Sequence, residues 1–278
     1  MNTILSKITH LPSLEEEYIL SDDQIRRYRE DGHLLLRRVA SPAEVDSYRP
    51  LIEQIVAESV AKHDSQGRIE DYSNLFLQVT NVWRLNEGIR RFVFAERFAK
   101  IAADLMGVEG VRLYHDQALF KPAGGKATHW HQDRFYWPLD TDHTITMWMP
   151  LVNVTKEMGT MMFAGGSHRA GSLGSMSISE GSHFAFEQLI AERGFPVADH
   201  EVNAGDATFH SGWTIHSAHA NTSSQVREVI TIIYFADGTR LMEPDNEFRK
   251  VDMEVFHPGQ KPGEVAASPL NPLLWRQP

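Results

Sequence analysis

The chain has 278 residues, of which 42% are hydrophobic, 23% charged and 10% aromatic, and this balance excludes global disorder because the apolar side chains suffice for a core. Acidic residues number 37 and Lys plus Arg 27, so the net charge of -10 excludes an overall attraction to nucleic acid or anionic lipid. There is no cysteine, which excludes disulfides, thiolate zinc sites, iron–sulfur clusters and cysteine nucleophiles, and leaves His, Asp and Glu as metal ligands.

The sequence predicts neither a membrane span nor a secretion signal. The longest strongly apolar run, 145–152, is far shorter than the ~20 residues that cross a bilayer as a helix. Residues 1–14 lack a basic segment followed by a continuous apolar one. We therefore expect a single domain over residues 1–278 that is cytoplasmic and has no membrane or nucleic-acid partner, and we predict no particular oligomeric state.

Residues 1–110 carry mainly helical patterns. Ser21 and Gly32 are typical capping residues around a first helix, Ser41 begins a second, and Gly107 ends a third. The elements expected here are helices over 24–30, 41–60 and 89–106, a short strand over 33–39, and a polar stretch without periodicity over 62–73.

After residue 110 the pattern changes to short β runs separated by Gly, Pro and Asp. The expected strands are 113–121, 144–152, 159–164, 206–209 and 228–235. Because no long helices separate these runs, a sandwich or barrel is favoured over a βαβ sheet. In the second run Thr144, Thr146 and Trp148 share one face, which should line a cavity while the apolar face packs on helices. The tail from His257 is expected to be irregular.

Histidine is the residue type that points to chemistry, because ten of the 14 histidines fall between His115 and His219. His131 and Asp133 are two residues apart, and on a strand such residues point the same way. A third ligand from a distant strand would complete a set of two histidines and one carboxylate, which leaves three positions open on Fe(II).

Further short motifs follow this pair along the chain. They are Gly165-Gly166-Ser167-His168, Gly205-Asp206, His216 and, eleven residues after His216, Arg227. In this order the motifs resemble the phytanoyl-CoA dioxygenase-like (PhyH) branch of the Fe(II)/2-oxoglutarate oxygenases. The resemblance extends over about residues 24–240 and includes Asn81-Val82-Trp83-Arg84, Leu105-Met106-Gly107 and Phe120-Lys121-Pro122.

The resemblance implies a fold, a metal and co-substrates. The fold is mainly β with added helices: a double-stranded β-helix (jelly roll, cupin-like) core over about 111–240, preceded by N-terminal helices. By resemblance His131, Asp133 and His216 ligate Fe(II), while Arg227 pairs with the distal carboxylate of 2-oxoglutarate, which suits a planar guanidinium. The residues expected near the co-substrate are Trp148 and Lys121.

The activity implied is hydroxylation of an unactivated C–H bond in a small organic molecule, with 2-oxoglutarate and O₂ consumed and succinate and CO₂ released. Asp133 disfavours halogenation, for which similar proteins need a small residue at that position. Ala218 departs from relatives that carry a hydroxyl residue there, and Ser217 or Thr146 is a candidate replacement. The residues expected on the substrate side are Gln78, Asn81, Trp83, Arg134 and Tyr136.

Three alternatives remain open from the sequence. His210 or His219 could replace His216 as the distal ligand if the eleven-residue spacing is disregarded. The same two histidines and one aspartate would also serve a zinc-dependent hydrolase, which predicts no role for Arg227. A cupin-like binding protein without catalytic activity would use the same pocket.

Overall fold

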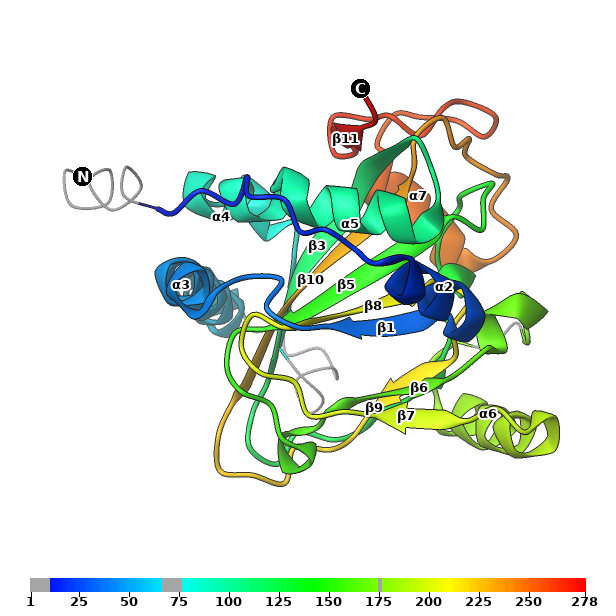
Figure 1. The fold of residues 1–278 in the computed structure, drawn as a ribbon, viewed down its shortest axis with the longest axis horizontal. Coiled ribbons are helices and arrows are strands. Elements are labelled where there is room, and N and C mark those ends of the chain that lie inside the picture. Colours follow the sequence, from blue (N-terminus) through cyan, green and yellow to red (C-terminus); the bar gives the residue numbers. More distant parts are fainter. Residues whose placement is uncertain (1–10, 67–76, 175–176) are drawn as a thin grey trace.

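The computed structural model describes residues 11–66, 77–174 and 177–278. Figure 1 shows two β sheets facing each other, with α4, α5 and α2 over the outer face of the larger sheet and α6 at one end of the smaller sheet. This arrangement is the double-stranded β-helix that the sequence predicted. No helix among the described residues is long and apolar enough to cross a membrane.

The large sheet has the strand order β1-β8-β5-β10-β3-β11, and β2 pairs with β3 beside β11. Its pairings are antiparallel throughout. Its strands are β1 (His33–Leu36), β2 (Leu77–Thr80), β3 (Gly110–Lys121), β5 (Thr144–Pro150), β8 (Ala207–Ser211), β10 (Arg227–Ala236) and β11 (Leu273–Arg276).

The small sheet has the strand order β4-β9-β6-β7, and its pairings are also antiparallel. Its strands are β4 (Thr128–His131), β6 (Met161–Ala164), β7 (Val197–Asp199) and β9 (His216–Ala218). Because these strands have only three or four residues, no alternation of polar and apolar residues is long enough to predict most of them.

Helices cover the outer face of the large sheet, and α2 begins and ends at the capping residues that the sequence predicted. Ser21 caps α2 through a capping box with Gln24, and Gly32 ends this helix in the left-handed conformation with φ 75°. The main core lies between the helices and the apolar face of β5, where Ile145, Met147 and Met149 are buried. The helices are α2 (Asp22–Asp31), α3 (Pro42–Gln66), α4 (Glu87–Val93), α5 (Glu96–Met106), α6 (Glu180–Arg193) and α7 (Glu247–Phe256).

The structure corrects the predicted helix over 89–106. Two helices, α4 and α5, replace it, because Ala95 leaves the helical region with ψ 119° and acts as the N-cap of α5. The break lets Phe94 pack against Trp83, with ring centroids 5.1 Å apart, while Phe92 packs against Phe98 in the core at the same centroid distance.

The second helix and several strand ends also differ from the prediction. The helix expected over 41–60 extends as α3 to Gln66, so part of the predicted polar stretch is helical, and residues 67–73 of that stretch lie outside the described residues. The strand expected over 33–39 ends at Leu36, and the strand expected over 159–164 begins at Met161.

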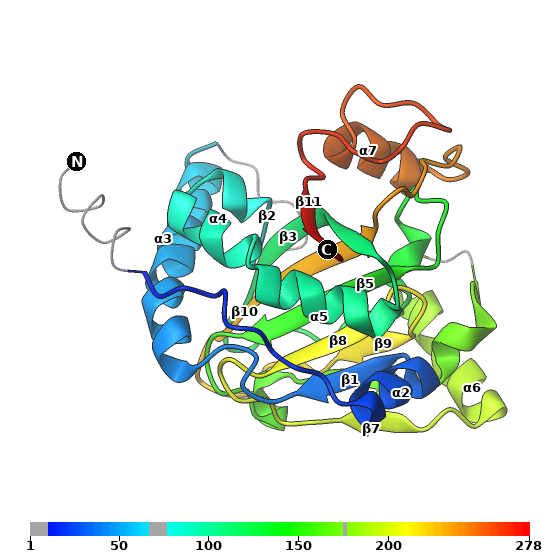
Figure 2. The ribbon, with the colours of Figure 1, turned by 45° about the horizontal axis from the view of Figure 1, so that its top comes forward.

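The C-terminal tail from His257 is irregular over most of its length, as expected, but it ends in the strand β11, which was not expected. Figure 2 shows the red C-terminal strand β11 at the edge of the large sheet, with α7 on the same side of the molecule. Trp275 and Arg276 of β11 pair with the start of β3, and Phe256 at the end of α7 stacks on His115 with ring centroids 4.3 Å apart. The pairing is short, so its signal in the sequence is weak.

Candidate metal centre

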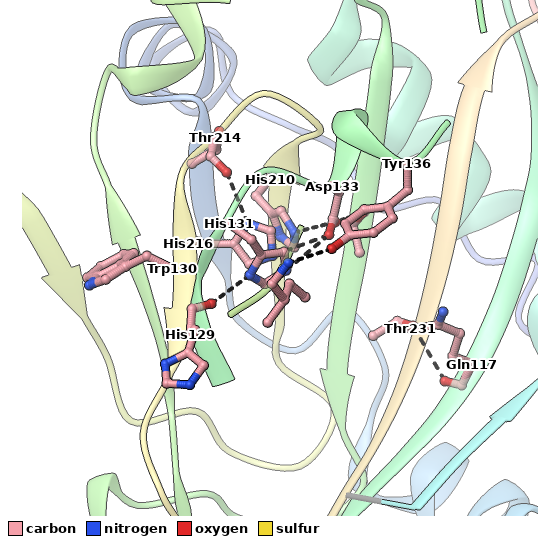
Figure 3. A network of polar contacts seen from close by, with 12 residues as sticks. Gln117, His129, Trp130, His131, Asp133, Tyr136, His210, Thr214, His216 and Thr231 are labelled. Atoms are coloured by element: carbon pink, nitrogen blue, oxygen red, sulfur yellow. Dashed lines mark hydrogen bonds and ion pairs between the residues drawn. The ribbon is translucent and has the colours of Figure 1, made fainter. Parts of the chain in front are cut away.

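The two predicted histidine ligands are neighbours across the small sheet. His131 ends β4 and His216 begins β9, and the two residues are cross-strand partners. Their ring centroids are 4.1 Å apart. The pairing therefore brings together residues that are far apart in the sequence (Figure 3).

Asp133 joins these histidines by a route that the sequence did not predict. It is not on a strand beside His131: β4 ends at His131, and Asp133 begins a short 3₁₀ helix, Asp133–Phe135. Gln132 fixes this change of direction, because its amide donates to the carbonyls of Gly171 and Trp213. The turn, rather than strand alternation, aims the carboxylate at the histidines.

The three side chains form a compact group of metal-ligand type. One atom from each of His131, Asp133 and His216 can be chosen so that all three lie within 4.8 Å of one another. Asp133 Oδ1 is 3.4 Å from His131 Nε2 and 3.5 Å from His216 Nε2. These distances leave room for a central ion.

The hydrogen bonds of the two rings set which nitrogen faces the centre. His131 Nδ1 is 2.8 Å from the carbonyl of His129, and His216 Nδ1 is 2.9 Å from the carbonyl of Thr214. A carbonyl only accepts, so each Nδ1 carries the proton and each Nε2 presents a lone pair toward Asp133. Two neutral imidazoles and one carboxylate are a donor set that suits Fe(II) or Zn²⁺.

Burial and neighbouring charges act on this group in opposite directions. Burial favours the neutral carboxyl of Asp133, but His216, His131 and His210 outweigh burial and hold the pKa of that carboxyl well below its usual range. Burial, followed by the neighbouring His131, holds the pKa of His216 well below its usual value. An ionised Asp133 beside a neutral His216 is the protonation state that a metal ion requires of these two ligands.

One row of the large sheet faces the metal group. Its rings approach the small sheet closely: Phe163 is 4.8 Å from His33 and 5.3 Å from His210 between centroids, and His210 is 4.4 Å from His216. Cross-strand pairing makes the row His33, His210, Thr146, Ile233 and His115.

The two alternative distal ligands have other contacts. His219 Nε2 is 3.3 Å from Asp199 Oδ2, so this side chain contacts a different aspartate from the one in the metal group. His210 Nε2 is 3.3 Å from Asp133 Oδ2 and therefore approaches the carboxylate oxygen that the other two histidines do not face.

Two basic side chains are buried near one end of the sandwich. Arg227 and Lys121 are cross-strand partners at the ends of β10 and β3. Arg227 donates to the carbonyl of Gly159 at 2.6 Å, and Lys121 donates to the carbonyl of His219 at 2.9 Å. Arg227 Nε is buried without a hydrogen-bond partner among the described residues.

Burial destabilises both of these positive charges. It lowers the pKa of Lys121 to about 7, with a further contribution from the charge of Arg227, and it lowers the pKa of Arg227 to about 10. The ring of Trp148 lies beside this pair, with its centroid 5.6 Å from Arg227 Cζ. Such a pair is suited to a bound carboxylate, which would supply the missing negative charge.

The two candidate hydroxyl residues face different ways. Ser217 lies between His216 and Ala218 on β9 and so points to the opposite face of the small sheet. Thr146 donates to Asp133 Oδ2 at 3.1 Å. Of the two, Thr146 is the one at the metal group.

Of the residues predicted on the substrate side, the structure places Tyr136 at the metal group. Its hydroxyl points toward His131, Asp133 and His216 in Figure 3, and it accepts a hydrogen bond from the backbone N–H of Ile178 at 2.9 Å.

Arg134 and the segment 78–83 have other surroundings. The Arg134 guanidinium donates to the carbonyls of Thr141, Trp137 and Leu139, and so holds the adjoining loop. Trp83 donates to Asn81 Oδ1 at 3.3 Å and packs in the helical layer, and Gln78 is exposed on β2.

The remaining motif residues brace the strands that carry the site. Ser167 Oγ accepts from the backbone N–H of Ile215 at 2.9 Å, directly before His216. The Asp206 carboxylate accepts from the backbone N–H of Arg38 at 2.8 Å and from the Arg37 guanidinium at 2.7 Å. The contacts of Asp206 tie the start of β8 to the N-terminal part of the fold, and the contact of Ser167 fixes the backbone directly before β9.

Comparison with known proteins agrees with this geometry. Residues 28–229 match the family model for phytanoyl-CoA dioxygenase (PhyH). The chain is 25% identical over 234 residues to an ectoine dioxygenase of Bordetella parapertussis, covering 77% of this chain and 75% of that protein.

Solved structures also resemble the chain over nearly its whole length. The non-heme alpha ketoglutarate dependent carbocyclase SnoK from nogalamycin biosynthesis superposes with a TM-score of 0.75 and 26% identity, covering 91% of this chain and 96% of SnoK. EctD from S. alaskensis, solved with 2-oxoglutarate and 5-hydroxyectoine, gives a TM-score of 0.66 at 18% identity, covering 86% and 87% of the two chains.

Proposed function

Because this chain belongs to the phytanoyl-CoA dioxygenase (PhyH) family and is an Fe(II)- and 2-oxoglutarate-dependent dioxygenase, we propose that it hydroxylates a small organic molecule at an iron held by His131, Asp133 and His216. The observations that carry the proposal are the metal-ligand group His131, Asp133 and His216 and the buried basic pair Arg227 and Lys121, which has no carboxylate partner among the described residues.

The donor set fits the metal, and the basic pair fits the co-substrate. Iron(II) with 2-oxoglutarate supplies the activation of O₂: one oxygen atom enters the substrate, the other enters succinate, and CO₂ is released. Arg227 and Lys121 would bind the distal carboxylate of 2-oxoglutarate, since neither has a carboxylate partner among the hydrogen bonds and ion pairs of the described residues.

Other residues near these two groups would control water access and orientation. Trp148 is 2% exposed, so its ring keeps water away from the carboxylate subsite. The Tyr136 hydroxyl, anchored by the N–H of Ile178, is the group that we place beside the substrate. Arg134 would act indirectly, by holding the loop after Tyr136.

A zinc hydrolase is the competing function for the same donor set. It gives no account of a buried, mutually repelling Arg227–Lys121 pair, whereas a dicarboxylate co-substrate does. We also propose a cytoplasmic location, because a reducing compartment keeps iron in the Fe(II) state.

The test is an anaerobic titration of the purified protein with Fe(II) and 2-oxoglutarate. We expect a weak visible charge-transfer band in the wild type and none in His131→Ala or His216→Ala. A normal band in His216→Ala together with its loss in His219→Ala would move the distal ligand to His219. Failure of the folded wild type to bind 2-oxoglutarate, combined with metal-dependent hydrolytic activity, would favour the zinc alternative.

A further inference from the structure

The two carboxylate oxygens of Asp133 have different surroundings. Oδ1 faces the two ligand histidines, at 3.4 Å from His131 Nε2 and 3.5 Å from His216 Nε2. Oδ2 instead lies 3.1 Å from Thr146 Oγ1 and 3.3 Å from His210 Nε2. One oxygen is thus free for a metal, and the other accepts hydrogen bonds (Figure 3).

The two groups that face Oδ2 are held together by the large sheet. Thr146 on β5 and His210 on β8 are cross-strand partners, so their side chains leave the same face of the sheet. The His210 side chain is 1% exposed and packs against Phe163 and His216. A side chain so enclosed keeps one orientation toward the carboxylate.

Hydrogen bonding sets the proton of His210. A carboxylate oxygen only accepts, so Nε2 carries the hydrogen that is donated to Oδ2. Nδ1 is buried without a hydrogen-bond partner among the described residues, and a proton placed there would be unsatisfied. His210 therefore donates to Oδ2 through its Nε2–H.

We infer that His210 and Thr146 are positioning residues that hold Oδ2 of Asp133, so that the carboxylate binds the metal through Oδ1 alone. The inference rests on the metal centre proposed above. A carboxylate that binds through one oxygen uses one coordination position, whereas binding through both oxygens would occupy a position needed for co-substrate or O₂. Hydrogen bonds to a ligand also fix its direction and tune its affinity for the metal.

The experiment measures binding of Co²⁺, whose visible bands report the number of ligands without any turnover. His210→Phe keeps a flat ring but removes the donor, and Thr146→Val keeps the shape but removes the hydroxyl. We expect Co²⁺ affinity to fall about 10- to 100-fold in His210→Phe and by a smaller factor in Thr146→Val, with altered band intensities in both variants. His210→Gln restores an N–H donor and should recover part of the affinity.

His219→Phe is the matched control. His219 Nε2 is also 3.3 Å from an aspartate oxygen, but that aspartate is Asp199, outside the metal group. Its substitution should leave Co²⁺ affinity and the visible bands unchanged. An equal loss in His219→Phe would show a general effect of removing a histidine and would overturn the inference.

The remaining outcomes separate the inference from the proposed centre. Wild-type Co²⁺ affinity and bands in a folded His210→Phe variant would overturn the inference while leaving the centre intact. Loss of binding as complete as in His216→Ala would also overturn it, by making His210 a ligand. If His216→Ala binds Co²⁺ normally, the centre itself is wrong. If circular dichroism shows that His210→Phe is unfolded, the Co²⁺ affinity and visible bands of Thr146→Val provide the test: wild-type values in that variant would overturn the inference.

Discussion

Arg227 and Lys121 face the same space from adjacent strands, and the hydrogen bonds of both side chains go to backbone carbonyls. Two buried cations without a carboxylate between them are costly in free energy. The protein retains this arrangement next to Trp148, whose ring offers only a weak attraction to the guanidinium. A carboxylate of 2-oxoglutarate bound between Arg227 and Lys121 would supply the negative charge that this pair lacks.

Arg227→Ala should weaken 2-oxoglutarate binding strongly. Removal of one partner from a buried charge pair costs about 2–5 kcal/mol, because the carboxylate is left unpaired. That energy corresponds to roughly 30-fold to several thousand-fold weaker affinity. The 2-oxoglutarate affinity of Arg227→Lys should lie between those of the wild type and Arg227→Ala, since an ammonium keeps the charge but loses the planar fork. A 2-oxoglutarate titration of the anaerobic visible band measures the effect, and unchanged affinity in Arg227→Ala would remove it from the carboxylate subsite.

The affinity for 2-oxoglutarate should fall as the pH rises above about 7. In the free protein, burial and then Arg227 lower the pKa of Lys121 to about 7. A bound carboxylate favours the charged ammonium and raises this pKa, so binding above about pH 7 takes up a proton and weakens by up to about tenfold per pH unit. Lys121→Met should bind 2-oxoglutarate weakly, and its affinity should depend little on pH. Titrations between about pH 7 and pH 9 test this, and equal slopes in both proteins would contradict it.

Gly159→Ala should weaken 2-oxoglutarate binding without removing a charged group. Gly159 has φ +89°, and a Cβ there would lie 2.5 Å from the carbonyl oxygen of His219. Gly159 and His219 supply the carbonyls that hold Arg227 and Lys121, so the clash would displace both basic groups. Gly124→Ala is the matched control, since Gly124 has φ +77° and open space around it. Equal 2-oxoglutarate affinities in the two variants would exclude a specific role for Gly159.

Asp116 should make the stability of the protein depend on pH. Burial raises the pKa of its carboxyl to about 7, and Oδ1 has no hydrogen-bond partner among the described residues. Below about pH 7 the folded state takes up a proton that the unfolded state does not bind until about pH 4. The free energy of unfolding should therefore rise by up to about 1.4 kcal/mol per pH unit as the pH falls through this window.

Asp116→Asn should lack this contribution, while other buried carboxyls such as Asp252 act equally in both proteins. Urea unfolding of the wild type and the variant between about pH 5 and pH 8 provides the comparison. A constant difference in unfolding free energy across that range would show that Asp116 does not titrate as expected.

The sequence predicted which three side chains would lie together, but not which backbone structure positions each of them. The order of the motifs and the eleven-residue spacing from His216 to Arg227 were the useful signals. Asp133 reaches the group through a 3₁₀ turn held by Gln132, and this turn depends on carbonyls of distant loops. Such contacts exist only in the folded chain and leave no local pattern.

The hydrogen bond between His210 and Asp133 was not predictable for a similar reason. It depends on the register that pairs His210 with Thr146 across β8 and β5, and a shift of one residue would turn His210 away. The helix break at Ala95 was missed because alanine favours helices, and the local preference yields to the packing of Phe94 on Trp83.

The histidines of the metal group and the residues that hydrogen-bond to its aspartate belong to different sheets. His131 and His216 belong to the small sheet, whereas the carboxylate of Asp133 leans on Thr146 and His210 of the large sheet. An ion bound there would link the two sheets through Asp133 and the hydrogen bonds that its Oδ2 accepts. Backbone amides of β9 should therefore exchange with deuterium more slowly in the metal-loaded protein.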